Sequence, residues 1–598
     1  MLLDLPVHVL HHVFTWLFAD EHVRLESCCQ SLKRTLDRPQ AWQTVAFQKN
    51  TPISKTFLES KLSFCTRILV VPKLEGPSWD ISSLDFLHKS PNLTHLKLNG
   101  HRDILDINPI GTLRHLQHLE MFECRGVRTL APLANCPSLT TLKTQLCNQI
   151  TNISVLSKCQ SLQSLTLGSE KLDNIDAIGH LTELRQLYLD TSRLRDLSPI
   201  GNCHKLEAFS CIGRHITNLS PFENCPTLRF VTLYDLENLT NIHGLAHCTE
   251  LQELSIDRSP NLVDVSALIR FPRLRRLLLD GVPVKCLDAL RFLKNLESFH
   301  ITNIQVPSID VLRHCVRLKS LHLGDCSKLE NLEALRNCLQ VEDLRISNCA
   351  NLKDISALIR FQHLWSLHLE KCTFLSDISP LAQCAQLSSL KLVGAEKLTQ
   401  ADALECCPNM IILNLNECTF LRQIRFLACM PKLETLSLNN CRSLREFLPL
   451  CFCRNLWNLH LDHTKIRSLS HLPNAPNLAT LHARNCDRLT DLGPLNRHVC
   501  LFYIDLSGCS ALSDFRVLRK CPALRNVYLN RTNLRDLDDL IGCENIHRLF
   551  VQDCPYLHNV DALNSFTNLV QVLFYGSPVA VENPSRLVAT LSSIRPPG

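Results

Sequence analysis

The sequence predicts an α/β solenoid whose parallel sheet lines a concave side and whose short turns line a convex side. The segment Leu364–Gln386, LWSLHLEKCTFLSDISPLAQCAQ, recurs in register along most of the 598 residues. Each copy opens with the alternation of apolar and polar residues that is typical of a half-buried strand. About thirteen residues then return the chain to the next strand. A chain that repeats in this way need not divide into several globular domains, because an array can absorb any length.

The period of this repeat identifies its class. When Leu364 is taken as the first position, the same position can be assigned twenty-two times between Leu93 and Leu569, at a mean spacing of about 22.7 residues. Leucine-rich repeats have periods of about 20 to 29 residues. We therefore expect a leucine-rich-repeat arc, in which each copy buries its apolar side only against its neighbours.

The shape of one repeat follows from its length and its prolines. Leu367 and Leu369 point to the same side of a strand, and strands stacked about 4.8 Å apart give an inner rim on the order of 100 Å long. The return path is too short for a full helix, and its many Ser-Pro and Cys-Pro pairs interrupt regular structure. We expect turns, short 3₁₀ helices or extended segments on the convex side.

The 31 cysteines follow the repeat. Twelve of them, the turn cysteines, stand three residues before a first position: Cys136, Cys159, Cys203, Cys225, Cys248, Cys315, Cys338, Cys384, Cys407, Cys453, Cys521 and Cys543. Ten more, the strand-end cysteines, stand eight residues after one: Cys124, Cys147, Cys326, Cys349, Cys372, Cys418, Cys441, Cys486, Cys509 and Cys554. Fixed offsets indicate two buried ladders of small apolar side chains with a weak S–H donor, which favours structural thiols over metal ligands.

Composition restricts the environment and the partners. The net charge is +6, and acidic and basic residues are interspersed, so no basic run predicts a nucleic-acid or membrane surface. No apolar run approaches 18 residues, and the first residues, MLLDLP, carry an acid where a secretory signal carries bases. Free thiols in an odd number favour a reducing compartment. We expect a soluble cytoplasmic protein that could also be nuclear.

Residues 1–47 do not fit the repeat and form a predicted helical module. Apolar residues recur with helical spacing in two segments, Val9–Leu17 and Leu25–Leu36, and Trp42 follows. The order of Leu5-Pro6, an amphipathic helix, Cys28-Cys29 and Trp42 resembles an F-box. Together with the repeats that follow, it resembles the layout of F-box/leucine-rich-repeat proteins, which are substrate receptors of cullin-based ubiquitin ligases.

That resemblance implies partners and a docking surface. The partners are a Skp-type adaptor and a cullin, and the residues that would contact the adaptor are Leu5, Pro6, Val9, Leu10, Val13, Phe14 and Leu17. The alternative is that residues 1–47 are only a helical cap over the first open turn of the solenoid.

The remaining boundaries follow the repeat register. Residues 48–92 form a transition with a degenerate first repeat, whose strand we expect at Ile68–Val70, and residues 93–575 form the solenoid. Residues 576–598 resemble the cap of phosphatase-regulator leucine-rich repeats, through Gly576, Pro578, Arg586, Leu587, Val588, Leu591 and Ile594. The core Asp377–Leu381 resembles the same class and internalins.

The sequence contains none of the motifs that we would expect of a catalytic or metal site. Phosphate-binding glycine loops, H-E-x-x-H, G-x-S-x-G and paired C-x-x-C are absent. A catalytic domain would need more than a hundred residues outside the repeat. We therefore predict a protein without enzymatic activity, cofactor or metal.

Two groups of residues are candidates for ligand contact on the concave strands. The first, the basic stripe, occupies the fourth position after the first leucine in five consecutive repeats: His300, His322, Arg345, His368 and Lys391. His300 and His322 could share a metal or titrate together, Arg345 could contact a phosphate or carboxylate, and the simplest interpretation is a solvated polar stripe. Glu342, Asp343 and Glu370 lie beside it and weaken an acidic-ligand interpretation.

The second group is aromatic. Phe502, Tyr503, Tyr528, Phe550 and Tyr575 fall on consecutive repeats in a chain with only 6% aromatic residues. Clustered exposed aromatics are favoured anchors in protein interfaces, but these side chains could instead pack on one another and stiffen the last repeats. Tyr503, Tyr528 and Phe550 are the predicted contacts.

The sequence thus predicts a non-catalytic receptor, with the adaptor on residues 1–47 and a target protein on the concave sheet. We expect it to be monomeric outside the ligase complex, and we expect it to bind neither nucleic acid nor membrane. The alternative is a leucine-rich-repeat scaffold or a regulator similar to phosphatase regulators. Adaptor binding discriminates between the two.

Overall fold

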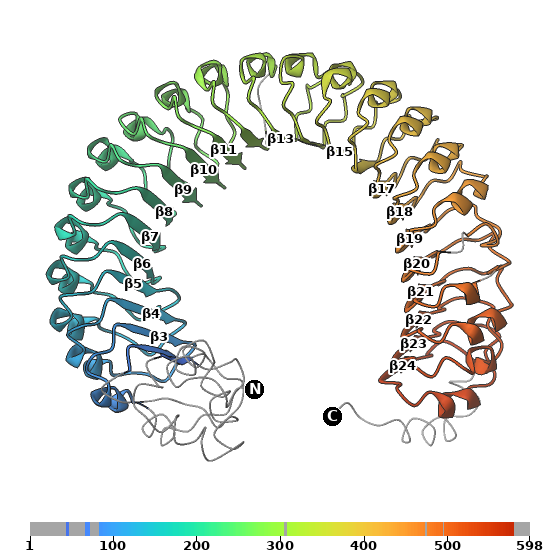
Figure 1. Ribbon diagram of the computed structural model, residues 1–598, viewed down its shortest axis with the longest axis horizontal. Helices are drawn as coiled ribbons and strands as arrows, with labels where there is room; N and C mark the ends of the chain where they lie inside the picture. The colour runs from blue at the N-terminus through green and yellow to red at the C-terminus, as the bar shows by residue number, and fades with distance from the viewer. Residues whose placement is uncertain are drawn as a thin grey trace, which may run out of the picture. The chain divides into compact units, whose positions relative to one another are not determined.

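The computed structural model describes residues 44–46, 62, 66–71, 83–303, 308–472, 475–493 and 495–578. The chain divides into two compact units, residues 1–296 and residues 297–598. Within each unit the strands lie side by side on the inner side and the 3₁₀ helices lie on the outer side (Figure 1). Each unit is therefore a leucine-rich-repeat solenoid.

Unit 1 contains a parallel sheet in chain order, each strand pairing in register with the next. Its strands are β1 Thr44–Ala46, β2 Ile68–Val71, β3 His95–Asn99, β4 His118–Phe122, β5 Thr141–Thr144, β6 Ser164–Gly168, β7 Gln186–Asp190, β8 Ala208–Ile212, β9 Phe230–Tyr234, β10 Glu253–Asp257 and β11 Arg276–Asp280. Its 3₁₀ helices are η3 Asp85–Lys89, η4 Asn108–Thr112, η5 Ala131–Asn135, η6 Ser154–Lys158, η7 Asp176–His180, η8 Ser198–Asn202, η9 Ser220–Asn224, η10 His243–Leu245, η11 Ser266–Arg270 and η12 Asp288–Phe292.

Unit 2 repeats this arrangement with its own parallel sheet. Its strands are β12 Ser298–Ile301, β13 Ser320–Gly324, β14 Asp343–Ser347, β15 Ser366–Glu370, β16 Ser389–Val393, β17 Ile412–Asn414, β18 Thr435–Ser437, β19 Asn458–His460, β20 Thr480–His482, β21 Tyr503–Asp505, β22 Asn526–Tyr528, β23 Arg548–Phe550 and β24 Gln571–Leu573. Its 3₁₀ helices are η13 Asp310–His314, η14 Glu333–Leu335, η15 Ser356–Arg360, η16 Ser379–Gln383, η17 Asp402–Cys406, η18 Arg425–Cys429, η19 Leu448–Phe452, η20 Leu495–Arg497, η21 Arg516–Lys520, η22 Leu537–Leu540 and η23 Asp561–Ser565.

The template repeat shows why this sequence forms this structure. All eight positions that define the repeat are at most 2% exposed: Leu364, Leu367, Leu369, Cys372, Leu375, Ile378, Leu381 and Cys384. Between the two strand leucines, His368 stays half-exposed on the opposite side of the strand. Each buried leucine contributes roughly 1.5–3 kcal/mol, and it does so only because the repeats on either side cover it. The predicted repeat is confirmed, and of the turns, short 3₁₀ helices and extended segments expected on the outer side, the structure shows 3₁₀ helices in most repeats.

The Asp-Ile-Ser-Pro-Leu core sets the path on the outer side. The Asp377 carboxylate, one residue before the N-cap residue Ile378, caps η16 from outside by accepting a hydrogen bond of 2.8 Å from the amide of its first residue, Ser379. Pro380 lies in the first turn of this helix, where no amide donor is needed. The Cys384 amide then donates to the Leu381 carbonyl at 2.9 Å and closes the turn. Aspartate or asparagine plays the same capping role in repeats of both units, as Asn152, Asp264 and Asp514 show.

Both cysteine ladders are buried, and they have a hydrogen-bonding role that goes beyond apolar packing. The turn cysteine Cys384 donates its S–H to the Leu358 carbonyl in the preceding repeat at 3.5 Å. The strand-end cysteine Cys418 does the same to the Leu392 carbonyl at 3.1 Å. Because each of these two thiols donates to a main-chain carbonyl of the preceding repeat and an alanine could not, cysteine is favoured here over alanine.

The burial of these thiols predicts their reactivity. Burial raises the pKa of Cys372 to about 12 and that of Cys384 to about 11, so almost no thiolate forms at neutral pH. In the native protein we expect Cys286, Cys406, Cys429 and Cys500, which are exposed, to react with maleimide roughly a hundredfold faster than the buried cysteines. Mass spectrometry of the labelled peptides would measure this, and ladder cysteines that label as fast as Cys286, or that are recovered as disulfides, would contradict it.

The two ends of the array contain the predicted first strand and the predicted cap. The predicted first strand is confirmed as β2, and β1 pairs with it. At the other end Ser577 is 1% exposed, and its hydroxyl accepts from the Cys554 amide at 3.0 Å and donates to the Val551 carbonyl at 2.8 Å. The predicted cap residues Arg586, Leu587, Val588, Leu591 and Ile594 lie outside the described residues.

Candidate protein-binding surfaces

The basic stripe forms one continuous row on the sheet of unit 2. In the parallel register His300 pairs with His322, His322 with Arg345, Arg345 with His368 and His368 with Lys391. The rings of His300 and His322 lie 4.0 Å apart between centroids. The five predicted side chains are therefore neighbours across β12 to β16.

The charge of this row is lower than its composition suggests. Arg345 forms an ion pair with Asp343, with 3.1 Å between Nε and Oδ2. Burial, followed by the positive charges of Lys391 and Arg345, lowers the pKa of His368, so this ring is neutral at pH 7. A solvated polar row fits these contacts better than a strong anion site.

Metal binding has little structural support in this row. Two histidines are brought together, but among the described residues no group of three or more His, Cys, Asp or Glu side chains is arranged to hold a metal ion. A pair of imidazoles alone leaves most of a tetrahedral ligand set unfilled.

The predicted aromatic residues do pack on one another. Tyr503 contacts Tyr528 with 5.3 Å between ring centroids, and Tyr528 stacks on Phe550 at 4.6 Å. Two histidines extend the row, because His482 stacks on Tyr503 at 4.6 Å and on His460 at 4.4 Å. We call these five residues, on β19 to β23, the aromatic stack.

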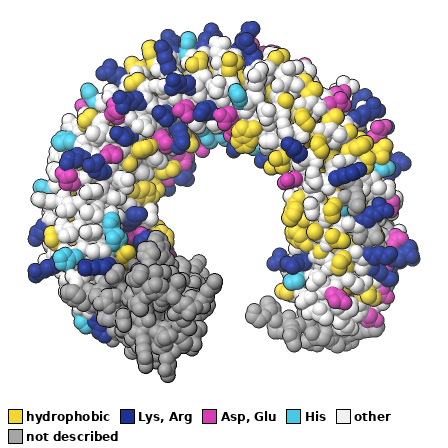
Figure 2. All heavy atoms as spheres, in the orientation of Figure 1, with side chains coloured by type: hydrophobic (Ala, Val, Ile, Leu, Met, Phe, Trp, Pro, Cys, Tyr) yellow, Lys and Arg dark blue, Asp and Glu magenta, His cyan; other side chains and the backbone are white. Residues whose placement is uncertain are grey.

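The aromatic stack remains accessible. All five side chains are half-buried, and Figure 2 shows hydrophobic side chains gathered on the sheet side of unit 2 over these strands. Phe502 and Tyr575 lie at its margins, since Phe502 precedes β21 and Tyr575 lies beyond β24 with 66% of its surface exposed. The stack is thus a stiff, partly apolar surface that a protein could cover with little loss of side-chain entropy.

An ion pair between an exposed arginine and a buried carboxylate anchors the middle of the stack. Asp505 is 1% exposed, and its carboxylate accepts from Arg484 Nε at 2.6 Å and from the Ser507 amide at 3.0 Å. The same guanidinium hydrogen-bonds Tyr503. Sequence reasoning missed this pair, because Arg484 and Asp505 belong to different repeats and look like ordinary surface residues.

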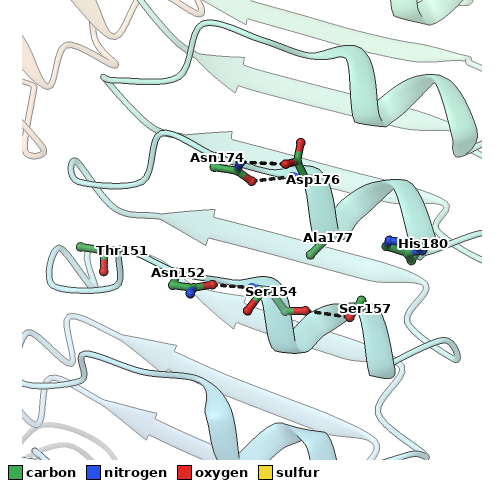
Figure 3. Close-up of a pocket in the computed structure, with 8 residues that line it drawn as sticks. All are labelled: Thr151, Asn152, Ser154, Ser157, Asn174, Asp176, Ala177 and His180. Carbon is green, nitrogen blue, oxygen red and sulfur yellow. Dashed lines mark hydrogen bonds between the residues drawn. The ribbon is translucent and has the colours of Figure 1, made fainter.

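A hollow in unit 1 is lined by polar side chains that include Ser154, Ser157 and His180. Figure 3 shows its lining between η6 and η7, where Asn152 and Asn174 cap the two helices through the amides of Ser154 and Asp176. The Ser157 hydroxyl donates to the Ser154 carbonyl at 2.8 Å. Among the residues drawn, no hydrogen bond joins His180 to a serine hydroxyl.

The predicted adaptor-contacting residues, from Leu5 to Leu17, lie outside the described residues. Comparison of the sequence with family models covers them: residues 2–44 match the F-box domain. The chain therefore combines an F-box match with a leucine-rich-repeat solenoid. The F-box match ends at residue 44, where the first strand of the sheet, β1, begins. F-boxes and leucine-rich repeats are typically binding modules.

Solved structures with similar folds are repeat proteins. An internalin from Listeria monocytogenes is 22% identical, with 57% of this chain and 89% of that chain covered and a TM-score of 0.40. A leucine-rich-repeat protein of Leptospira interrogans is 15% identical, with 79% and 99% covered and a TM-score of 0.44. A plant peptide hormone receptor in complex with RGF2 is 15% identical, with 92% and 95% covered and a TM-score of 0.39. No curated protein matches the chain.

Within the part of the chain that the structure describes, no helix has the length and apolar character needed to cross a membrane.

Proposed function

We propose that this protein is the substrate-recognition subunit of a cullin-type ubiquitin ligase. The observation that carries the proposal is the F-box match at residues 2–44, directly followed by the repeat array. Such a chain needs no catalytic residues of its own, because the ubiquitin-transferring subunits are recruited through the adaptor. Ligase assembly of this kind places the protein in the cytoplasm or the nucleus.

In this proposal the two ends of the chain have separate tasks. Leu5, Pro6, Val9, Leu10, Val13, Phe14 and Leu17 dock a Skp-type adaptor, and a cullin joins through it. The sheet of unit 2 holds the target protein, with the aromatic stack supplying buried area and the basic stripe supplying polar direction. The stack supports this division because stacked, half-exposed aromatics are favoured anchors for a protein partner.

Deleting the F-box should abolish the co-purification of adaptor and cullin. The deletion should end at residue 43, since β1 pairs with β2 and protects the edge of the sheet. The tagged full chain and residues 44–598 would be purified from cells, and their partners quantified by mass spectrometry. We expect adaptor and cullin only with the full chain, and the target protein with both.

Point variants control for the missing module. Val13→Asp places a charge on the predicted apolar face and should have the effect of the deletion, whereas His12→Asp, outside that face, should not. Adaptor retained by residues 44–598, or never captured by the full chain, would favour the scaffold or phosphatase-regulator alternative instead.

A further inference from the structure

A second kind of surface lies on the loops of unit 2 that connect the strands to the 3₁₀ helices. Between the repeats that begin at Met410 and Leu433 there is a hollow of about 540 Å³. We call it the arginine pocket, and its lining includes Phe420, Arg422, Gln423, Arg442, Arg445 and Glu446. No part of it belongs to the basic stripe or to the aromatic stack.

The charge of this hollow is not neutralised locally. Arg422, Arg442 and Arg445 are all exposed, and none of the ion pairs between described residues includes them. Elsewhere on this edge an equivalent basic residue is paired, as Lys353 is with Glu330 at 2.7 Å. Three guanidinium groups and the Glu446 carboxylate leave a local charge of about +2, which matches the −1.5 to −2 of a phosphate monoester at pH 7.

The backbone-capping pattern is also interrupted at this place. The position that caps each 3₁₀ helix is aspartate or asparagine in most repeats, for example Asp377 and Asp491. In the repeat before the pocket this position is Gln400, and in the two repeats that line the pocket it is Gln423 and Glu446. Their longer side chains make no capping hydrogen bond in the structure. The residues at this edge are therefore not explained by the needs of the repeat.

Phe420 adds an apolar surface beside the arginines. Two repeats earlier, Phe374 has the ammonium of Lys397 over its ring at 3.9 Å. In the repeat that follows Phe420, Ser443 occupies the position that Lys397 occupies in the repeat that follows Phe374. The serine side chain is too short to cover the ring, and Phe420 remains 55% exposed. An extended peptide could lay one apolar residue on this ring while a neighbouring charged group meets the guanidinium forks.

We propose that the arginine pocket binds a phosphorylated serine or threonine side chain in a protein segment. Arginine forks donate paired hydrogen bonds to phosphate oxygens, which lysine cannot reproduce. A positive charge confined to one hollow suits a single phosphorylated side chain better than a nucleic acid, which needs a basic track along many phosphates. It also suits it better than an anionic membrane, whose protein sites carry about four to eight cations. The inference rests on the proposed function only in taking the ligand to be a protein.

The test uses the purified full chain and two labelled peptide libraries, with random flanks around a central phosphoserine or a central serine. We expect fluorescence anisotropy to show at least tenfold tighter binding of the phosphoserine library. Arg422→Gln/Arg442→Gln/Arg445→Gln should abolish the difference, and the triple lysine variant should retain only part of it. The control Arg128→Gln/Arg535→Gln, at corresponding loop positions outside the pocket, should bind like the parent.

Equal binding of the two libraries overturns the inference, and so does a preference that survives the glutamine variant. Binding of poly(U) RNA or of vesicles with phosphatidylserine in place of the phosphopeptides also overturns it. Adaptor binding is measured separately on the same preparations. If the chain binds the adaptor but not the phosphopeptides, only the phosphate-binding proposal for the arginine pocket is overturned. If it binds the phosphopeptides but not the adaptor, only the proposed ligase function is overturned.

Discussion

The variant Cys372→Asp should lower the free energy of unfolding by about 3–5 kcal/mol, because it places a carboxylate where no partner or water can reach it. Cys372 is fully buried, and its thiol donates a hydrogen bond to the Glu370 carbonyl at 3.7 Å. Cys372→Ala removes one sulfur atom and should cost only about 1–2 kcal/mol. Urea unfolding followed by circular dichroism would measure both.

The loss in free energy of unfolding caused by Cys372→Asp should also depend on pH. Burial raises the pKa of the introduced carboxyl above its unfolded value, so the folded state binds more protons and stability falls as pH rises. The loss in free energy of unfolding, relative to the parent, should therefore be larger at pH 8 than at pH 5. Cys286→Asp, at an exposed position, should change stability by about 0.5 kcal/mol or less at either pH. Equal costs at the two cysteines would contradict the buried-ladder interpretation.

Removing the aromatic stack should weaken binding of the target protein at least a hundredfold once that target is identified. Tyr503→Ala/Tyr528→Ala/Phe550→Ala deletes three neighbouring aromatic anchors, and two of them are tyrosines, a residue type enriched among the residues that dominate interfaces. Arg345→Glu/Lys391→Glu should have a smaller effect of about tenfold, mainly on the association rate. Surface plasmon resonance on the full chain separates the two rates.

Matched controls show whether these effects are local. Phe374→Ala/Tyr556→Ala removes two exposed aromatics from the loops, away from the sheet, and should leave binding unchanged. The charge swap should fold like the parent, whereas the aromatic triple should lose some stability at the end of unit 2 because its rings stack. If both sheet variants fold and bind like the parent, recognition lies elsewhere, and the arginine pocket is the next surface to examine.

The sequence predicted the repeat, the buried ladders and the neighbours in the basic stripe for one physical reason. In a parallel array of constant period, residues with the same offset are adjacent in space, so Arg345 must lie between His322 and His368. Offsets could not predict which side chains pair across the surface. The ion pair of Arg345 with Asp343 and the stacking of His482 on Tyr503 depend on rotamers and on the curvature of the sheet.

Features outside the strands were harder to predict. Arg422 and Arg445 have the same offset in neighbouring repeats, so the register places them next to each other, whereas Arg442 has a different offset and only the path of its loop brings it to the same hollow. The S–H donation of Cys384 to the Leu358 carbonyl likewise needs the distance between stacked turns. The absence of aspartate or asparagine at positions 400, 423 and 446 was a sequence signal that could have directed attention to this edge.

Direct complex formation between the purified chain and a Skp-type adaptor tests the central claim most directly. The two proteins would be mixed, and the molar mass of the eluting species measured by light scattering during size-exclusion chromatography. The proposed function predicts one species with the summed mass of one chain and one adaptor, which is lost with Val13→Asp and retained with His12→Asp. Separate elution of the two parent proteins, at concentrations where other F-box chains bind the same adaptor preparation, would contradict it.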